Sequence, residues 1–261
     1  MTGNRSGRHF LQIPGPTNVP ERVLRVIQQP TIDHRGPRFQ QLVRDILDRL
    51  QLIFRTDSPI IIFPSSGTGA WEAALVNTLS AGDKVLMYET GHFASLWYTL
   101  AERLGLDPQL IAGNWRTGID ADAIQRILEE DSGHNIKAVC VVHNETSTGV
   151  TSDIQAVRHA IDSAGHAALL MVDTISSLAS IDYRHDEWGV DVTVALGMTG
   201  DVQTLEPVEV ARLDQLDRAV ELADRRSGRA AQKQRLFDTG LRHVAVDPVL
   251  ELGGVLHDPR G

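Results

Sequence analysis

The sequence predicts an α/β fold, an αβα sandwich whose sheet is mostly parallel. Short apolar runs rich in β-branched residues recur between residues 58 and 195, as is typical of strands covered on both faces. Segments with apolar residues at helical spacing separate these runs, and such alternation favours parallel strands joined by right-handed crossovers. Ligands of such sheets bind at the carboxyl ends of the strands, so the loops there are the candidate site.

One stretch, residues 58–75, organises the chain. Residues 60–63 are apolar and largely β-branched and predict a buried strand, while residues 65–69 form a small-residue loop before a helix that carries Trp71 and Leu75. A helix N-terminus behind such a loop presents free N–H groups and the positive end of the helix dipole, so a phosphate is the expected ligand. The loop has neither the P-loop nor the dinucleotide-binding glycine pattern, and a plain strand–helix turn is the alternative.

Two helices are expected before this stretch, at residues 21–27 and 39–54. The second has a regular apolar face, made by Leu42, Ile46, Leu50 and Ile53. Together with the proline-punctuated segment that begins the chain, they form an N-terminal region, residues 1–57, ahead of the core.

After residue 75, strands and helices alternate. Apolar runs predict strands at residues 84–88, 109–112, 136–142, 167–172 and 190–195. Amphipathic patterns predict helices at residues 93–104, 120–129 and 153–164. The first of these helices ends near Gly105, the second opens with acidic residues that the dipole favours, and Asp153 is the expected N-cap of the third.

The chain changes in character at residue 196. All tryptophans and tyrosines precede it, and the only aromatic residue beyond it is Phe237. We therefore expect a core at residues 58–195 and an unmatched tail at residues 196–261 that is foreign to the parent fold. A small C-terminal domain is the alternative.

Bulk composition excludes several classes of function. The net charge of -9 and the pI near 5.5 argue against general nucleic-acid binding, and no apolar stretch reaches membrane length. The ten histidines are scattered, so no metal site is expected. Cys140 lies in a strand pattern and is expected to be a buried structural thiol. One cysteine and a polar start at residues 1–9 favour a cytoplasmic protein.

Three loops follow predicted strands and carry the chemistry. They are the small-residue loop at 65–69, a row of hydroxyl and amide groups at 143–149, and residues 173–177, which begin with Asp173. Together they offer a phosphate cradle, hydroxyl donors and a carboxylate that can pair with a cationic ring nitrogen. Pyridoxal phosphate requires this set, because an acidic partner keeps its pyridine nitrogen protonated. Each loop alone has a structural alternative, such as an N-cap role for the aspartate.

Four motifs in order resemble class V aminotransferases, closest to the serine–glyoxylate and alanine–glyoxylate branch. The resemblance covers about residues 8–195 and rests on the segments 14–17, 66–75, 143–149 and 172–178. It implies a pyridoxal-phosphate-transferase-like (fold-type I) large domain that is incomplete here, since the family's small C-terminal domain is not recognisable. It also implies a homodimer whose substrates are a small amino acid and a 2-oxo acid.

The resemblance assigns site residues by position. Ser66, Gly67 and Thr68 match the phosphate-binding loop, and Phe93 matches an aromatic residue that stacks on the cofactor ring. Thr146 matches a hydroxyl near the ring oxygen, Asp173 the partner of the pyridine nitrogen, and Ile175 the residue packed on the other face of the ring. A segment near the substrate is matched by Pro14, Gly15, Pro16 and Thr17, with a rigid proline turn as the alternative.

The sequence departs from the family where the catalytic lysine is expected. The family has Gly-Ser-Gln-Lys after the last strand of this region, whereas this chain reads Leu196-Gly197-Met198-Thr199-Gly200. The resemblance implies transamination between serine or alanine and glyoxylate or a similar 2-oxo acid. The missing lysine predicts an inactive chain, from a truncated or frameshifted coding sequence or a divergent homologue. Another class V activity, such as a ureidoglycine–glyoxylate aminotransferase or a lyase, and a non-catalytic remnant or partner subunit are the alternatives.

Overall fold

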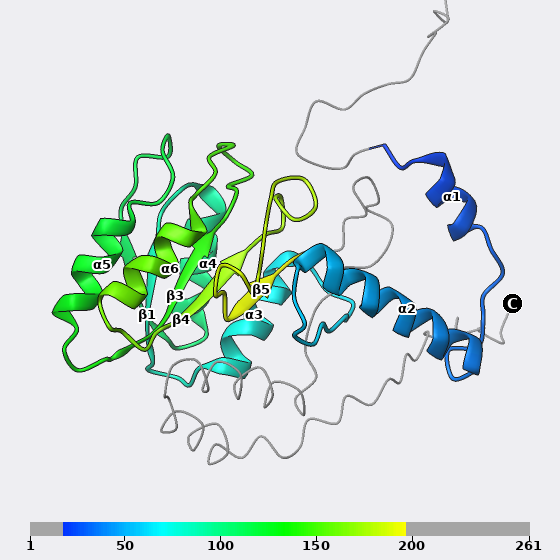
Figure 1. The fold of residues 1–261 in the computed structure, drawn as a ribbon, viewed down its shortest axis with the longest axis horizontal. Coiled ribbons are helices and arrows are strands. Elements are labelled where there is room, and N and C mark those ends of the chain that lie inside the picture. The colour runs from blue at the N-terminus through cyan, green and yellow to red at the C-terminus, as the bar shows by residue number, and fades with distance from the viewer. Residues whose placement is uncertain (1–17, 197–261) are drawn as a thin grey trace, which may run out of the picture.

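The computed structural model describes residues 18–196 of the chain. In chain order its elements are α1 (Glu21–Ile27), α2 (Pro37–Phe54), α3 (Gly67–Thr78), β1 (Lys84–Tyr88), α4 (His92–Arg103), β2 (Asp107–Ile111), α5 (Ala121–Glu130), β3 (Ile136–Val142), α6 (Ile154–Ser163), β4 (Leu169–Asp173) and β5 (Val192–Val194). In this part of the chain the strands form one parallel sheet in the order β2-β1-β3-β4-β5 (Figure 1). The predicted α/β fold with a parallel sheet is therefore confirmed.

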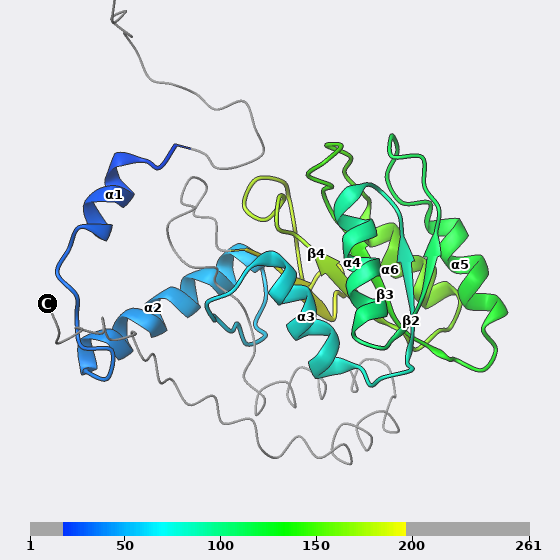
Figure 2. The same ribbon diagram turned by 180° about the vertical axis from the view of Figure 1, so that it is seen from behind.

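The sheet is the middle layer of three. Helices α5 and α6 cover one face, seen in Figure 1, and α3 and α4 cover the other, seen in Figure 2. Alternate residues of β3 face opposite layers: Val139 and Val141 belong to the core under α5 and α6, whereas Cys140 and Val142 belong to the core under α3 and α4. The continuous apolar sequence of β3 is thus explained by burial on both faces.

Local sequence signals set the helix boundaries. Asp120 and Asp153 accept hydrogen bonds from backbone N–H groups in the first turns of α5 and α6, which confirms the predicted N-cap at Asp153. Gly105, just beyond the end of α4, has a φ of 79°, a left-handed conformation that glycine adopts without steric cost. Strand and helix ends differ from the predicted ones by a few residues at most.

One predicted strand is wrong. Residues 60–63 have no regular secondary structure and belong to no strand of the described sheet. Ile60 packs with Phe54 and Ala195 in a small separate core, alongside β5. A β-branched run specifies extended backbone, but a strand also needs a partner edge, and no described strand supplies one to these residues.

Helix α2 runs outward from the sheet (Figure 1). Its predicted apolar face exists, yet Leu42, Ile46 and Ile53 are exposed, and Phe54 is its only buried residue. Among residues 18–196, no helix combines the length and the apolar character that crossing a membrane requires.

Candidate cofactor site

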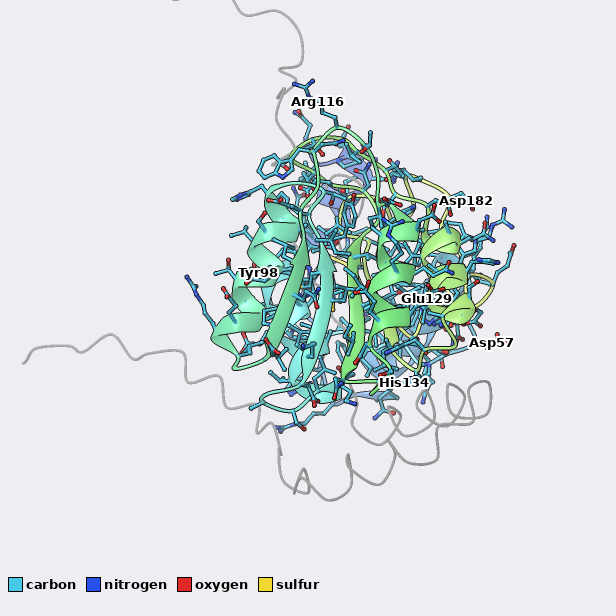
Figure 3. The ribbon with its side chains drawn as sticks, turned by 90° about the vertical axis from the view of Figure 1, so that its left-hand side faces the viewer. Asp57, Tyr98, Arg116, Glu129, His134 and Asp182 are labelled. Atoms are coloured by element: carbon cyan, nitrogen blue, oxygen red, sulfur yellow. The ribbon has the colours of Figure 1, made fainter. Side chains whose placement is uncertain are left out.

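The candidate site lies at the edge of the sheet where the strands end. Because β1 to β5 are parallel, the loops that follow them meet at one edge. Figure 3 shows both ends of the sheet, with Arg116 in the loop after β2 at one end and His134, before β3, at the other. The residues predicted to bind the cofactor belong to the loops and helix starts at the Arg116 end.

The small-residue loop leads into the N-terminus of α3. Ser66 is the N-cap residue, and its hydroxyl accepts a hydrogen bond from the backbone N–H of Gly69 at 3.2 Å. Gly67 packs closely, since a Cβ at this position would clash with Cδ1 of Ile175 and the end of that side chain would have to move. The loop and the segment after β4 are therefore in contact, as predicted. The first N–H groups of the helix, at Gly67 and Thr68, are not needed for its backbone ladder and face outward from its end.

Asp173, the last residue of β4, is a buried carboxylate with only 3% of its surface exposed. Its Oδ1 accepts a hydrogen bond from the backbone N–H of Ile175 at 2.7 Å, and its Oδ2 accepts one from Nε1 of Trp71 at 2.8 Å. Burial raises the pKa of Asp173 to about 7, the two hydrogen bonds oppose this rise, and the nearby charge of Glu145 adds to it. Such a carboxyl group is ready to share a proton with a basic partner.

Phe93 is held between a tryptophan and a glutamate. Its ring meets the ring of Trp71 edge to face, with 6.4 Å between centroids. Its backbone N–H and that of Ala94 donate to the two carboxylate oxygens of Glu145, at 3.3 and 3.2 Å. Glu145 is fully buried, and its charge is balanced by these N–H groups and by the dipole of α4. This contact joins the loop after β3 to the start of α4.

Close packing enforces the same junction at Gly91. A Cβ there would lie 2.5 Å from Cγ of Glu145 and 2.6 Å from the hydroxyl of Ser147. Ser147 in turn donates from its hydroxyl and its backbone N–H to Glu145, at 2.7 and 3.1 Å. Thr146 lies between Glu145 and Ser147 and is partly exposed. Its position near the start of α4 is set by these two neighbours.

The structure brings six of the predicted residues to one edge of the sheet. Gly67 packs against Ile175, whose backbone N–H donates to Asp173, and Ser66 caps the helix that begins at Gly67. Phe93 contacts Trp71, which donates to Asp173, and Thr146 is placed by its neighbour Glu145, which accepts from the N–H of Phe93. Thr68 follows Gly67 in the first turn of α3. The predicted substrate segment, residues 14–17, lies outside the described residues.

The lysines of the described chain are far from this edge. Lys84 begins β1 and lies 3.8 Å from Asp107, and Lys137, near the start of β3, donates to the carbonyl of His134. Both residues are at the opposite ends of the strands, as the sequence predicts. Neither can reach a ligand at the carboxyl edge.

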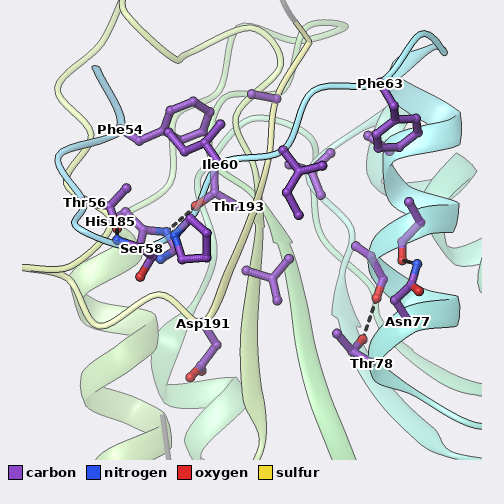
Figure 4. A pocket seen from close by; sticks show the side chains of 18 residues that line it. Phe54, Thr56, Ser58, Ile60, Phe63, Asn77, Thr78, His185, Asp191 and Thr193 are labelled. Atoms are coloured by element: carbon purple, nitrogen blue, oxygen red, sulfur yellow. Dashed lines mark hydrogen bonds between the residues drawn. The ribbon is translucent and has the colours of Figure 1, made fainter. Parts of the chain in front are cut away.

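A separate hollow of about 100 Å³ lies beside β5 (Figure 4). It is bounded by the edge of β5 that faces away from β4, by helix α3 and by residues 58–63, and its lining includes Ile60, Ala74 and Val194. None of the predicted cofactor residues lines it. This hollow is therefore a gap along the edge of the sheet, distinct from the candidate site.

The donor set at the carboxyl edge fits pyridoxal phosphate. A helix start with free N–H groups suits the phosphate, and the buried carboxyl group of Asp173 suits a pyridine nitrogen that must keep its proton. The hydroxyl of Thr146 and the apolar side chains of Phe93 and Ile175 suit the ring substituent and the ring faces. A lysine for covalent attachment is missing among residues 18–196. The described residues therefore offer groups that suit non-covalent contacts with the cofactor, and among them no lysine lies at this edge.

This fold and this site define a class, the fold-type I enzymes that use pyridoxal phosphate. A solved structure of alanine–glyoxylate aminotransferase from Nostoc sp. superimposes with a TM-score of 0.70 at 28% identity, covering 82% of this chain and 55% of that one. A family model, aminotransferase class-V, matches residues 9–197. The chain belongs to the class V aminotransferase family, whose members depend on pyridoxal phosphate.

Curated relatives place the chain within that family. It is 44% identical over 234 residues to serine–glyoxylate aminotransferase from Methylorubrum extorquens, covering 89% of this chain and 58% of the relative. It is 48% identical over 191 residues to serine–glyoxylate aminotransferase from Hyphomicrobium methylovorum, covering 73% and 47%. The chain spans about half the length of the curated relatives that it matches.

Two residues of the site were not assigned from the sequence. Trp71 reads only as an apolar position of a helix, and Glu145 only as one letter of a polar loop. The sequence does hold a signal for Glu145, since an acidic residue inside a row of small polar residues needs a partner if it is buried. For Trp71 it holds none, because its partner Asp173 lies 102 residues away.

Proposed function

We propose that this chain is the cofactor-binding part of an amino acid–glyoxylate aminotransferase and that, as it stands, it holds pyridoxal phosphate without a covalent bond. The observation that carries the proposal is the buried carboxyl group of Asp173 at the end of β4, in contact with the segment that packs on the phosphate loop. Within this proposal, residues 58–195 are the cofactor-binding core, residues 1–57 its N-terminal extension, and residues 196–261 supply no catalytic group.

Each residue has a task in this function. Pyridoxal phosphate, when bound, supplies an electron sink that stabilises negative charge on the α-carbon of an amino acid. Asp173 keeps a proton on the ring nitrogen, and the backbone N–H groups of Gly67 and Thr68 bind the phosphate with the help of Ser66. Thr146 orients the ring through its oxygen substituent. Phe93 and Ile175 would cover the two faces of the ring and exclude water.

Serine and glyoxylate are the proposed substrates of the complete enzyme. The names of the two serine–glyoxylate relatives support this choice. A relative from Paracoccus denitrificans, also 44% identical, is named L-aspartate–glyoxylate aminotransferase, so aspartate is the alternative amino donor. Another class V reaction, such as the ureidoglycine–glyoxylate transamination named for a relative from Bacillus subtilis at 30% identity, is the second candidate. The described residues do not distinguish the two, since the proposed substrate segment lies at residues 14–17.

The proposal includes a lack of turnover by this chain. If the family's Gly-Ser-Gln-Lys is counted from the residue after Ala195, its lysine falls at Thr199, and no lysine stands anywhere in Leu196-Gly197-Met198-Thr199-Gly200. The two lysines of the described region are at the wrong ends of their strands. Without a lysine amine, the chain has no group to release the cofactor to an amino acid or to move the α-proton.

The test combines labelling with a gain of function. The chain is mixed with pyridoxal phosphate, reduced with borohydride and mapped by peptide mass spectrometry, and no lysine is expected to be labelled stoichiometrically. The Thr199→Lys variant is treated in parallel, and label at residue 199 is expected if the family position is preserved. Production of hydroxypyruvate from L-serine and glyoxylate by the unaltered chain, or stoichiometric label on Lys84, Lys137 or Lys233, would contradict the proposal.

We further propose that the chain pairs as a homodimer through helix α2. The apolar residues Leu42, Ile46 and Ile53 of α2 are exposed in the isolated chain, and burying them against a second copy would remove apolar surface from water. Sedimentation of the chain and of the Ile46→Asp variant tests this. The variant is expected to be monomeric at concentrations where the original chain is dimeric, and equal sedimentation of the two would refute the pairing.

A further inference from the structure

Trp71 contacts two of the residues assigned to the cofactor. Its indole N–H donates to Oδ2 of Asp173 at 2.8 Å, and its ring meets Phe93 edge to face. The side chain is 2% exposed and lies one turn into α3, directly behind the phosphate loop. It therefore joins the helix that starts at the phosphate loop to the partner of the pyridine nitrogen and to the ring-stacking residue.

Trp97 provides a natural comparison. It stacks on Trp71 with 5.6 Å between ring centroids and 12° between ring planes, and it is fully buried on α4. Unlike that of Trp71, its Nε1 has no hydrogen-bond partner among the described residues. The two tryptophans thus pack against each other, and Trp71 differs from Trp97 in its hydrogen bond to Asp173 and in its contact with Phe93.

We propose that Trp71 is a positioning residue that orients the Asp173 carboxylate toward the cofactor ring and keeps it available as an anion. This inference deepens the proposed function and rests on it. Oδ1 of the carboxylate is fixed by the backbone N–H of Ile175, so the Trp71 bond to Oδ2 fixes the plane of the group. Each oxygen retains a further lone pair, so either can still accept a proton or hydrogen bond from a ring nitrogen.

The charge state of Asp173 is set by a few groups. Burial and the carboxylate of Glu145 raise its pKa, while the hydrogen bonds from Ile175 and Trp71 lower it. His143, whose backbone N–H donates to the carbonyl of Asp173, is itself buried, and burial lowers its pKa, so it brings no opposing positive charge near pH 7. Losing the Trp71 N–H therefore raises the pKa of Asp173, and no cation among residues 18–196 contributes to lowering it.

The experiment measures pyridoxamine phosphate binding by calorimetry between pH 5.5 and 9 for the original chain, Trp71→Phe and Trp97→Phe. This ligand is an amine and does not need a lysine to bind. Below the pKa of Asp173, the free carboxyl group and the ring nitrogen of the free ligand each carry a proton. Only one of these protons fits between them in the complex, so binding must release the other. The affinity therefore falls as pH falls, which gives the acid limb of the binding curve. We expect this acid limb to move upward by roughly one to two pH units in Trp71→Phe, the effect of one hydrogen bond to a charged group. We expect no displacement in Trp97→Phe.

The two outcomes separate positioning from packing. A general loss of packing lowers affinity at every pH and in both variants, without moving the limb. Coincident acid limbs for the two variants would overturn this inference while leaving the proposed function intact. Absence of pyridoxamine phosphate binding by the original chain would overturn both.

A second measurement needs no cofactor and no variant of Trp71. Because the indole N–H of Trp71 bonds a titrating carboxylate, the tryptophan emission of the original chain is expected to change with a midpoint near pH 7. This transition is expected to disappear in Asp173→Asn. Its persistence in that variant would show that Trp71 does not sense Asp173 and would overturn the inference.

Discussion

Replacing Asp173 with asparagine is expected to change the pH dependence of folding in a defined direction. In the cofactor-free chain, burial raises the pKa of Asp173 to about 7, whereas an aspartate in the unfolded chain titrates near 3.9. The native state therefore holds a proton that the unfolded state lacks between these values. By linkage, the stability that this group contributes is complete below the unfolded pKa and is lost as pH rises through 7. Asparagine does not titrate, so the variant lacks this loss.

The magnitude follows from the width of the pH window. From pH 5 to the native pKa near 7 there are about two units, each worth 1.36 kcal/mol, so the original chain should lose ~3 kcal/mol that the variant keeps. Asparagine has one acceptor oxygen for two N–H donors, those of Trp71 and Ile175, so one hydrogen bond is lost. This cost is the same at both pH values and cancels in the comparison.

The assay is urea unfolding followed by far-ultraviolet circular dichroism at pH 5 and pH 8.5. The free energy of unfolding of Asp173→Asn minus that of the original chain should be ~3 kcal/mol higher at pH 8.5 than at pH 5, so the variant is relatively more stable at the higher pH. The control is Asp153→Asn, at an exposed N-cap where asparagine caps as well as aspartate. An equal relative stability of Asp173→Asn at the two pH values would refute the argument that burial neutralises Asp173.

Three further predictions concern the surroundings of the site. Gly67→Ala should weaken pyridoxamine phosphate binding about tenfold, because the added methyl group displaces Ile175. Unchanged affinity in calorimetry would show that this contact does not shape the site. Glu145→Gln should lower the free energy of unfolding, measured in urea, by about 1.5–3 kcal/mol, because an amide cannot accept from all the N–H groups that the carboxylate does. An unchanged midpoint of urea unfolding would argue against that hydrogen-bond network. Cys140, buried with its pKa raised by burial, should react with a disulfide reagent at pH 8 only after urea is added, and prompt reaction in the native chain would contradict its place in β3.

Local patterns accounted for most of the fold. The strand at Ile136–Val142 and the N-cap at Asp153 were predicted as observed, because buried β-branched runs and aspartate caps act over a few residues. The three site loops were also predicted, since strand ends and parallel pairing together determine where loops meet. The motif resemblance added roles for single residues within those loops.

The sequence by itself determined the layers, the site edge and the aspartate that ends β4, because each of these follows from short-range pattern. Tertiary structure alone decided that residues 60–63 join no described strand, since pairing requires a partner edge that no local pattern supplies. It also decided that Trp71 bonds Asp173 across 102 residues and that Glu145 bonds Phe93 across 52. Such contacts form because folding leaves few buried polar groups without a partner, and which partner is within reach is a property of the three-dimensional structure.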